Sequence, residues 1–94
     1  MQFGLFSLMT QRERGLGARE IYQNMVEHVK LAEQIGFDVA WFAEHHFSNY
    51  SLSPSPITLA TCLAPQTSRI RLGTAVIVVP LYQPLRMLMA IRRI

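Results

Sequence analysis

Residues 37–48 read FDVAWFAEHHFS, and this stretch decides the fold class. Its first seven residues form an apolar run that only Asp38 interrupts, which is typical of a β-strand covered on both faces. Strands of this kind occur mainly in parallel sheets, because the crossover helices pack on the sheet. We therefore expect a buried parallel strand here, followed by a polar loop that begins with Glu44, His45 and His46.

A helix is expected on the amino-terminal side of this strand, at residues 18–35. Its apolar residues recur at spacings of three and four, which predicts one buried face. They are Ile21, Met25, Val29, Ala32 and Ile35. Gly36 stands where a left-handed C-terminal cap belongs. A mixed aromatic and aliphatic run at residues 2–8 predicts an earlier strand, and the polar residues 10–17 predict the loop between them.

Two further elements are expected on the carboxyl-terminal side. Ser55 and Pro56 make a good N-cap and first helical position. The buried face of that helix is expected to comprise Ile57, Ala60, Thr61 and Ala64. Pro65 should kink or stop the helix. The β-branched residues of 69–80, RIRLGTAVIVVP, predict a third buried strand, and residues 83–91, QPLRMLMAI, predict a third helix.

The elements therefore alternate as β, α, β, α, β, α, with a repeat of about 30 to 35 residues. One strand and one amphipathic helix per repeat make a parallel βαβ unit, so we expect an α/β protein. An open doubly wound sheet and a closed (β/α)8 barrel both fit this order. No GxGxxG follows the first strand, so the dinucleotide-binding version of the open sheet has no support. In either architecture, functional groups gather where strands end, as Glu44, His45 and His46 do.

Composition and charge argue against some classes of function. No apolar run approaches the roughly 18 to 20 residues that span a bilayer, and no secretory signal pattern is present, so a cytoplasmic protein is expected. Residues 1–44 carry four basic and six acidic side chains, whereas residues 45–94 carry five arginines and no acid. These arginines form no stripe, so nucleic-acid binding is not expected. Cys62, Trp41 and Phe42 are expected to be buried.

The EHH triplet allows a reaction site, a metal site or a plain loop. A metal ion needs three or four converging ligands, and two histidines at the helical spacing i and i+4 are absent, so no metal site is expected. Adjacent residues in extended chain point in opposite directions, so His46 should pack or hydrogen-bond behind His45 if His45 faces a pocket. Glu44 could orient a histidine or cap a helix. No spacing selects among the hydroxyls of Tyr22, Tyr50 and Tyr82.

Three separate stretches resemble one family in order and spacing. They are FGLF at residues 3–6, AEQIGFDVAWFAEHHF at residues 32–47 and LAPQTSRIRLGTAVIVVPLYQPLR at residues 63–86. They look like the amino-terminal portion of the bacterial luciferase-like flavin monooxygenases. The resemblance implies that residues 1–94 form the first three βα units of a (β/α)8 TIM barrel, truncated after about the third unit. It implies a flavoprotein oxidoreductase that uses reduced FMN and dioxygen to oxidise an aldehyde or another small organic substrate, or alternatively a deazaflavin enzyme.

The resemblance also assigns a catalytic group. His45 falls on the histidine that acts near the reactive edge of the flavin in the luciferases, with Glu44 and His46 as its neighbours. Histidine suits this chemistry, because its unperturbed pKa of about 6.5 lets it give or take a proton near neutral pH. Glu44 and His46 are expected to support His45.

Three more residues fall on positions that contact the cofactor. Phe6 falls on an aromatic residue near the flavin ring, and Ala75 and Val76 fall on a pair joined by a non-proline cis peptide that packs against the ring. The family's phosphate-binding residues lie in later strands. Three strands leave both sheet edges unpaired, so we expect a homo-oligomer or association with a complementary barrel fragment. A non-catalytic truncated fragment or assembly module is the alternative to an enzyme.

Overall fold

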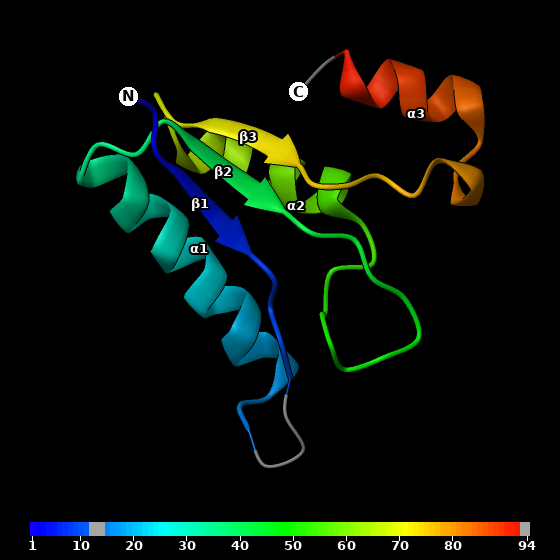
Figure 1. Ribbon diagram of the computed structural model, residues 1–94, viewed down its shortest axis with the longest axis horizontal. Coiled ribbons are helices and arrows are strands. Elements are labelled where there is room, and N and C mark those ends of the chain that lie inside the picture. The colour runs from blue at the N-terminus through cyan, green and yellow to red at the C-terminus, as the bar shows by residue number, and fades with distance from the viewer. Residues whose placement is uncertain (12–14, 93–94) are drawn as a thin grey trace.

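Strands and helices alternate along the chain in the computed structural model, which describes residues 1–11 and 15–92 (Figure 1). The elements are β1 (Gly4–Ser7), α1 (Ala18–Gln34), β2 (Val39–Phe42), α2 (Pro56–Leu63), the 3-10 helix η1 (Ala64–Gln66), β3 (Arg71–Thr74), the 3-10 helix η2 (Val79–Leu81) and α3 (Pro84–Ile91). Residues 12–14, in the polar loop expected after the first strand, lie outside the described residues.

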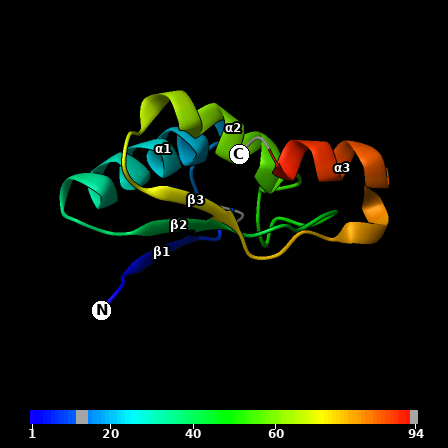
Figure 2. The same cartoon turned by 90° about the horizontal axis from the view of Figure 1, so that it is seen from above.

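The strands form one parallel sheet in the order β1-β2-β3. Phe6 pairs with Trp41, and Trp41 pairs with Gly73, so the three strands end at the same edge. The helices α1 and α2 lie on the same face of this sheet (Figure 2). Parallel neighbours joined by helices are βαβ units, so the expected α/β class is confirmed.

The core lies between the sheet and the helices α1 and α2. Strand alternation directs Ala40 and Phe42 toward the helices, and the exposed fraction of both is 0%. The other members of the core are Met9, Ile21, Met25, Val29, Ala32, Leu59, Ala60, Leu63 and Ile70. Trp41 points to the opposite face of the sheet and is 40% exposed. The prediction of a buried residue is therefore confirmed for Phe42 and wrong for Trp41. The expectation of a strand covered on both faces was also wrong for the described residues, because α1 and α2 cover only one face and neighbouring strand residues face opposite sides.

The helix α1 has the buried face that its periodicity predicts, with one exception. Ile35 is 63% exposed, because α1 ends at Gln34 and the chain has already begun to turn. Gly36 follows with a φ of 98°, a conformation that side chains with a Cβ rarely adopt. The predicted glycine cap is therefore confirmed.

The helix α2 begins as predicted, because Thr58 donates its backbone N–H to Oγ of Ser55. It ends where Pro65 lies in η1. The buried residues of α2 are Pro56, Leu59, Ala60 and Leu63. Of the expected face, Ala60 is buried and Ile57 half-buried, whereas Thr61 and Ala64 are exposed, so that prediction is confirmed only in part. Cys62 is exposed, so its expected burial was wrong. An apolar helix can bury several alternative faces, and contact with β2 and β3 selects one of them.

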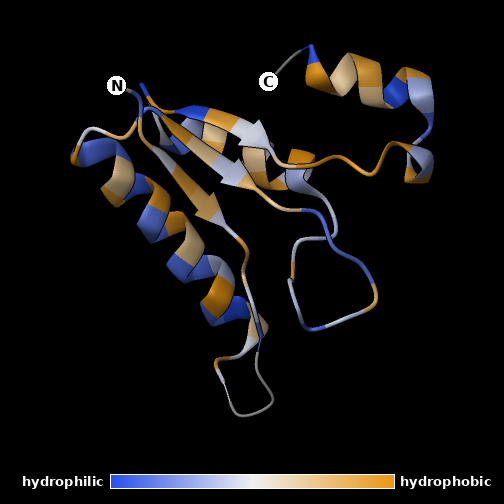
Figure 3. Cartoon of the chain, in the orientation of Figure 1, coloured by the Kyte–Doolittle hydropathy of each residue, from blue (hydrophilic) through white to orange (hydrophobic). Residues whose placement is uncertain are grey.

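The third strand is shorter than its sequence predicts, and the expectation that it is buried was wrong, because none of the residues of β3 is fully buried. The partner strand β2 ends at Phe42, which pairs with Thr74, so the chain after β3 has no strand beside it among the described residues. Residues 75–78 are instead irregular, although they are strongly hydrophobic (Figure 3). The helix α3 forms as predicted, but it has no buried residue and lies apart from α1 (Figures 1 and 2).

Candidate functional site at the carboxyl edge of the sheet

The candidate site lies where the parallel strands end. Ser7, Phe42 and Thr74 occupy matching positions in the register, so the loops that follow them start side by side. The backbone continues this alignment by one step, because Ala75 donates its N–H to the carbonyl of Phe42 over 2.8 Å. The residues after β2 and those after β3 therefore meet at one edge.

Glu44 connects these two loops. Its residue is 4% exposed, and its side chain has no exposed surface. Oε1 lies 2.7 Å from Nε2 of His46, and Oε2 accepts the backbone N–H of Val78 over 2.9 Å. One buried carboxylate thus holds the histidine loop and the chain after β3, and the expectation that Glu44 orients a histidine agrees with this contact.

Tyr82 lies near Glu44, although no sequence spacing distinguishes it from the other tyrosines. Its hydroxyl oxygen is buried and makes no hydrogen bond within the described residues. Burial raises the pKa of Tyr82 above its usual value, and the neighbouring Glu44 carboxylate raises it further. The signal that identifies Tyr82 is three-dimensional, because the residue lies far from Glu44 along the chain.

His45 follows Glu44 in the same loop and lines one pocket together with His46. It donates its backbone N–H to the carbonyl of Ser53 over 2.9 Å, and its ring meets Tyr50 edge-on with ring centres 5.0 Å apart. The half-buried imidazole lines a pocket of about 340 Å³ between the loop and the start of α1. Ser53 also donates its hydroxyl to the carbonyl of Ala43 over 2.5 Å, which closes the base of the loop.

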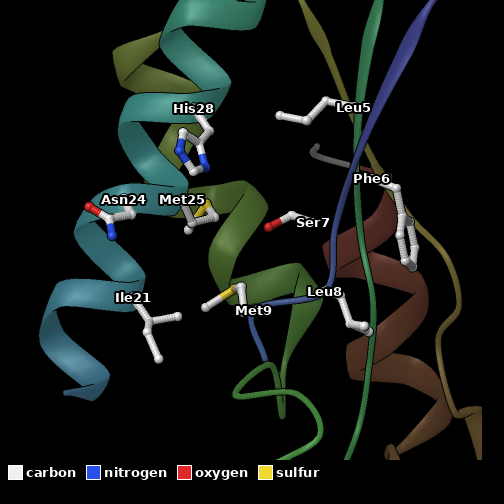
Figure 4. A pocket seen from close by; sticks show the side chains of 9 residues that line it. All are labelled: Leu5, Phe6, Ser7, Leu8, Met9, Ile21, Asn24, Met25 and His28. Carbon is white, nitrogen blue, oxygen red and sulfur yellow. The ribbon is translucent and has the colours of Figure 1, made fainter. Parts of the chain in front are cut away.

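Phe6 points away from α1, whereas its neighbours in β1 point toward that helix (Figure 4). It is 55% exposed. A pocket of about 260 Å³ lies between β1 and α1, and Figure 4 shows the polar side chains of Asn24 and His28 at its helical wall. The remaining lining residues are Leu5, Phe6, Ser7, Leu8, Met9, Ile21 and Met25.

The Ala75–Val76 peptide bond is cis, as the family resemblance implies. Val76 is 64% exposed. The structure therefore joins some of the expected site residues and separates others. Hydrogen bonds link Glu44 to His46 and to the chain after Val76. His45 and His46 line one pocket and Phe6 lines another, and neither pocket includes Ala75.

The described residues hold neither a metal-binding cluster nor a membrane-spanning helix. No group of three or more histidine, cysteine, aspartate or glutamate side chains among them is arranged to hold a metal ion. None of the helices in that part of the chain has the length and apolar character needed to cross a membrane.

The chain is similar in sequence and in fold to known proteins. The sequence model of the luciferase-like monooxygenases matches residues 1–92. An uncharacterized protein, y4vJ, of Sinorhizobium fredii is 52% identical over 88 residues. The alkanal monooxygenase alpha chain of the Kryptophanaron alfredi symbiont is 36% identical over 88 residues. The oxygenase component of the flavin-dependent trigonelline monooxygenase of Acinetobacter baylyi is 31% identical over 87 residues.

These matches cover 93–94% of this chain and 24–25% of the relatives, so the chain spans about a quarter of their length. Solved structures give the same ratio. The monooxygenase RslO1 from Streptomyces bottropensis has a TM-score of 0.90 at 27% identity, over 97% of this chain and 28% of its own. The oxygenating constituent of 3,6-diketocamphane monooxygenase of Pseudomonas putida, in complex with FMN, has a TM-score of 0.85 at 23% identity, over 97% of this chain and 25% of its own.

Proposed function

The chain belongs to the luciferase-like monooxygenase family, and from this premise we propose that it forms part of a flavin-dependent monooxygenase site. The proposed reaction uses reduced FMN and dioxygen to oxidise an aldehyde or another small organic substrate. Two relatives support the class of reaction, because one is an alkanal monooxygenase and the other a flavin-dependent monooxygenase. FMN is preferred to a deazaflavin because a structural neighbour is in complex with FMN.

One observation carries the proposal. The chain after β2 and the chain after β3 are tied together at the carboxyl edge by Glu44, so the histidine loop adjoins the Ala75–Val76 segment. In parallel α/β folds, ligands bind at this edge because the loops that follow the strands converge there. The relation is a property of the folded chain, and it agrees with the family assignment without depending on it.

The residues at this edge suit the ring of a flavin. Phe6 and Trp41 are neighbours on the sheet face away from the helices, and both are partly exposed. Val76 adds exposed apolar surface after β3. A flat aromatic ring gains stability by burying such surface. The phosphate of FMN needs other partners, because Arg69 and Arg71 lie at the opposite end of β3.

The proposal gives each residue a role. Phe6, Ala75 and Val76 contact the ring, and His45 moves a proton at the reacting edge. When bound, the reduced flavin would be the group that reacts with dioxygen. The chain's own residues would orient the flavin ring and exchange the proton. Histidine can do this near neutral pH. Glu44 and His46 support the loop that carries His45.

We further propose that residues 1–94 correspond to the first three βα units of a (β/α)8 barrel. A barrel of this type takes about 250 residues, and this chain spans about a quarter of its relatives. Both outer edges of the sheet are without a strand partner in the described part of the chain. We therefore propose that they are covered by a second copy or by a complementary barrel fragment, since unpaired edges favour association.

The test is a titration of the purified chain with reduced and oxidised FMN, and with a deazaflavin for comparison. The chain has one tryptophan, Trp41, on the sheet face proposed for the ring, so binding should quench its fluorescence. His45→Ala should leave the FMN dissociation constant within about twofold and lower aldehyde oxidation at least 100-fold. The matched control, His28→Ala, should leave both unchanged.

A non-catalytic assembly module is the second candidate, and the many exposed apolar side chains of α3 favour it. The same titration separates the two. Absence of binding by either form of FMN at about 1 mM, which corresponds to roughly −4 kcal/mol, would reject a flavin site in this chain and favour the module. Equal aldehyde oxidation by the wild type and His45→Ala would remove His45 from the mechanism.

A further inference from the structure

We infer that Glu44 is a positioning residue whose two carboxylate oxygens fix His46 and the chain at Val78 relative to each other. The inference rests on the proposed function, because it assigns Glu44 a place in the flavin site. Glu44 does not reach the substrate in this role. It sets the ring orientation and tautomer of His46 and holds the segment that follows Ala75–Val76.

The carboxylate of Glu44 is fully buried. The Glu44 side chain has no exposed surface, so its oxygens must find donors within the protein. Each oxygen has one: Nε2 of His46 at 2.7 Å and the backbone N–H of Val78 at 2.9 Å. The two donors belong to loops that follow different strands. Removing the carboxylate therefore releases two loops at once.

The carboxylate of Glu44 also determines the tautomer of His46. A carboxylate only accepts hydrogen bonds, so Nε2 of His46 must carry a proton. In the neutral imidazole this leaves Nδ1 as the unprotonated nitrogen. Glu44 thereby determines which nitrogen of His46 is free to accept a hydrogen bond. A residue that merely filled space would have no such effect.

The hydroxyl of Tyr82 belongs to a third segment near Glu44. The hydroxyl oxygen is buried and makes no hydrogen bond within the described residues. Burial and the nearby Glu44 raise the pKa of Tyr82. Tyr82 follows η2, so the carboxylate lies near a third segment of the chain besides the loop of His46 and the backbone of Val78. Glu44 is thus the common neighbour of all three segments.

The test is nuclear magnetic resonance of the chain with ¹⁵N-labelled histidine, at a pH at which the imidazoles are neutral. In the wild type, His46 should be protonated on Nε2. In Glu44→Gln, the single amide oxygen should keep the Val78 N–H, and the amide nitrogen should then donate to Nε2 of His46. The ring proton should move to Nδ1, while Glu27→Gln, an exposed control, should leave the tautomer unchanged.

A wild-type His46 protonated on Nδ1 would overturn the inference, and this measurement needs no variant to fold. An unchanged tautomer in a folded Glu44→Gln chain, verified by circular dichroism, would overturn it as well. Exchange of the Val78 amide proton with solvent gives a second readout. It should be slow in the wild type and at least about tenfold faster in Glu44→Ala, and equal rates would contradict the inference.

FMN titration separates this inference from the proposed function. If the wild type binds FMN, Glu44→Gln should weaken binding by about tenfold, whereas Glu27→Gln should bind normally. If the wild type binds no flavin, the proposed function fails and Glu44 loses its place in a flavin site. In that case a shift of the His46 tautomer still establishes the contact itself. FMN affinity that is equal in the wild type and Glu44→Gln would reject the positioning role.

Discussion

The carboxylate of Glu33 in α1 lies 2.9 Å from the backbone nitrogen of Ile70 and accepts its N–H. The same oxygen also accepts the N–H groups of Arg69 and Ser68. These hydrogen bonds, with that of Arg69 the largest contribution, lower the pKa of Glu33 from 4.5 to about 2. The contact ties the end of α1 to the start of β3.

Acid should therefore weaken the fold through Glu33. Because the pKa is lower in the folded chain than in the unfolded chain, its contribution is complete above about pH 4.5 and is lost as the pH falls toward 2. Urea unfolding of the wild type should show this loss, and Glu33→Gln should be less stable at pH 7 with a flatter profile between these pH values. Glu27→Gln is the control, and a profile for Glu33→Gln as steep as the wild type's would contradict the assignment.

Gly73→Ala should displace the indole of Trp41. A Cβ at position 73 would lie 2.6 Å from two ring carbons of Trp41. This distance is shorter than the van der Waals contact distance between two carbon atoms, so the ring would have to move. Because the ring is partly exposed and can move, we expect a loss of about 1 kcal/mol in the free energy of unfolding together with a shift in tryptophan emission. Gly17→Ala has free space around its Cβ and should change neither. Unchanged emission in Gly73→Ala would show that the indole lies elsewhere.

Leu63→Ala should remove a central part of the core. The Leu63 side chain is 0% exposed, and it packs from α2 against the sheet. Truncation of a buried leucine costs about 2 to 5 kcal/mol, a large share of the stability of a small domain. Leu31→Ala, on the exposed side of α1, is the matched control and should cost less than about 1 kcal/mol. Equal midpoints of urea unfolding in the two variants would place Leu63 outside the core.

The chain should associate at micromolar concentration through its exposed apolar surface. On α3 this surface comprises Leu85, Leu88, Met89 and Ile91. Analytical ultracentrifugation should show species larger than a monomer, and Leu88→Lys should reduce them, because a charge within an apolar contact is costly. Leu31→Lys is the control, because that exposed leucine belongs to α1, which lies apart from α3. A well-folded wild-type monomer at this concentration would reject the prediction.

Much of the fold follows from local patterns. The spacing of three and four in α1 predicts its buried face from Ile21 to Ala32, and Gly36 marks its end. The alternation of strands and helices predicts the parallel sheet, which in turn predicts that Glu44, His45 and His46 stand at a strand end. These features depend on the helical period of 3.6 residues and the strand period of 2 residues. Both periods are visible in the sequence without knowledge of distant contacts.

Other features depend on contacts between distant residues, and only the tertiary structure decides them. Trp41 and Phe42 are equally apolar in the sequence, yet pairing with β1 and β3 places one on the open face and the other in the core. Glu44 could orient a histidine or cap a helix by sequence alone. Its hydrogen bond to Val78 spans 34 residues and exists because parallel register brings two strand ends together. The sequence by itself determined the elements and their order, whereas the packing of the strands determined which side chains meet.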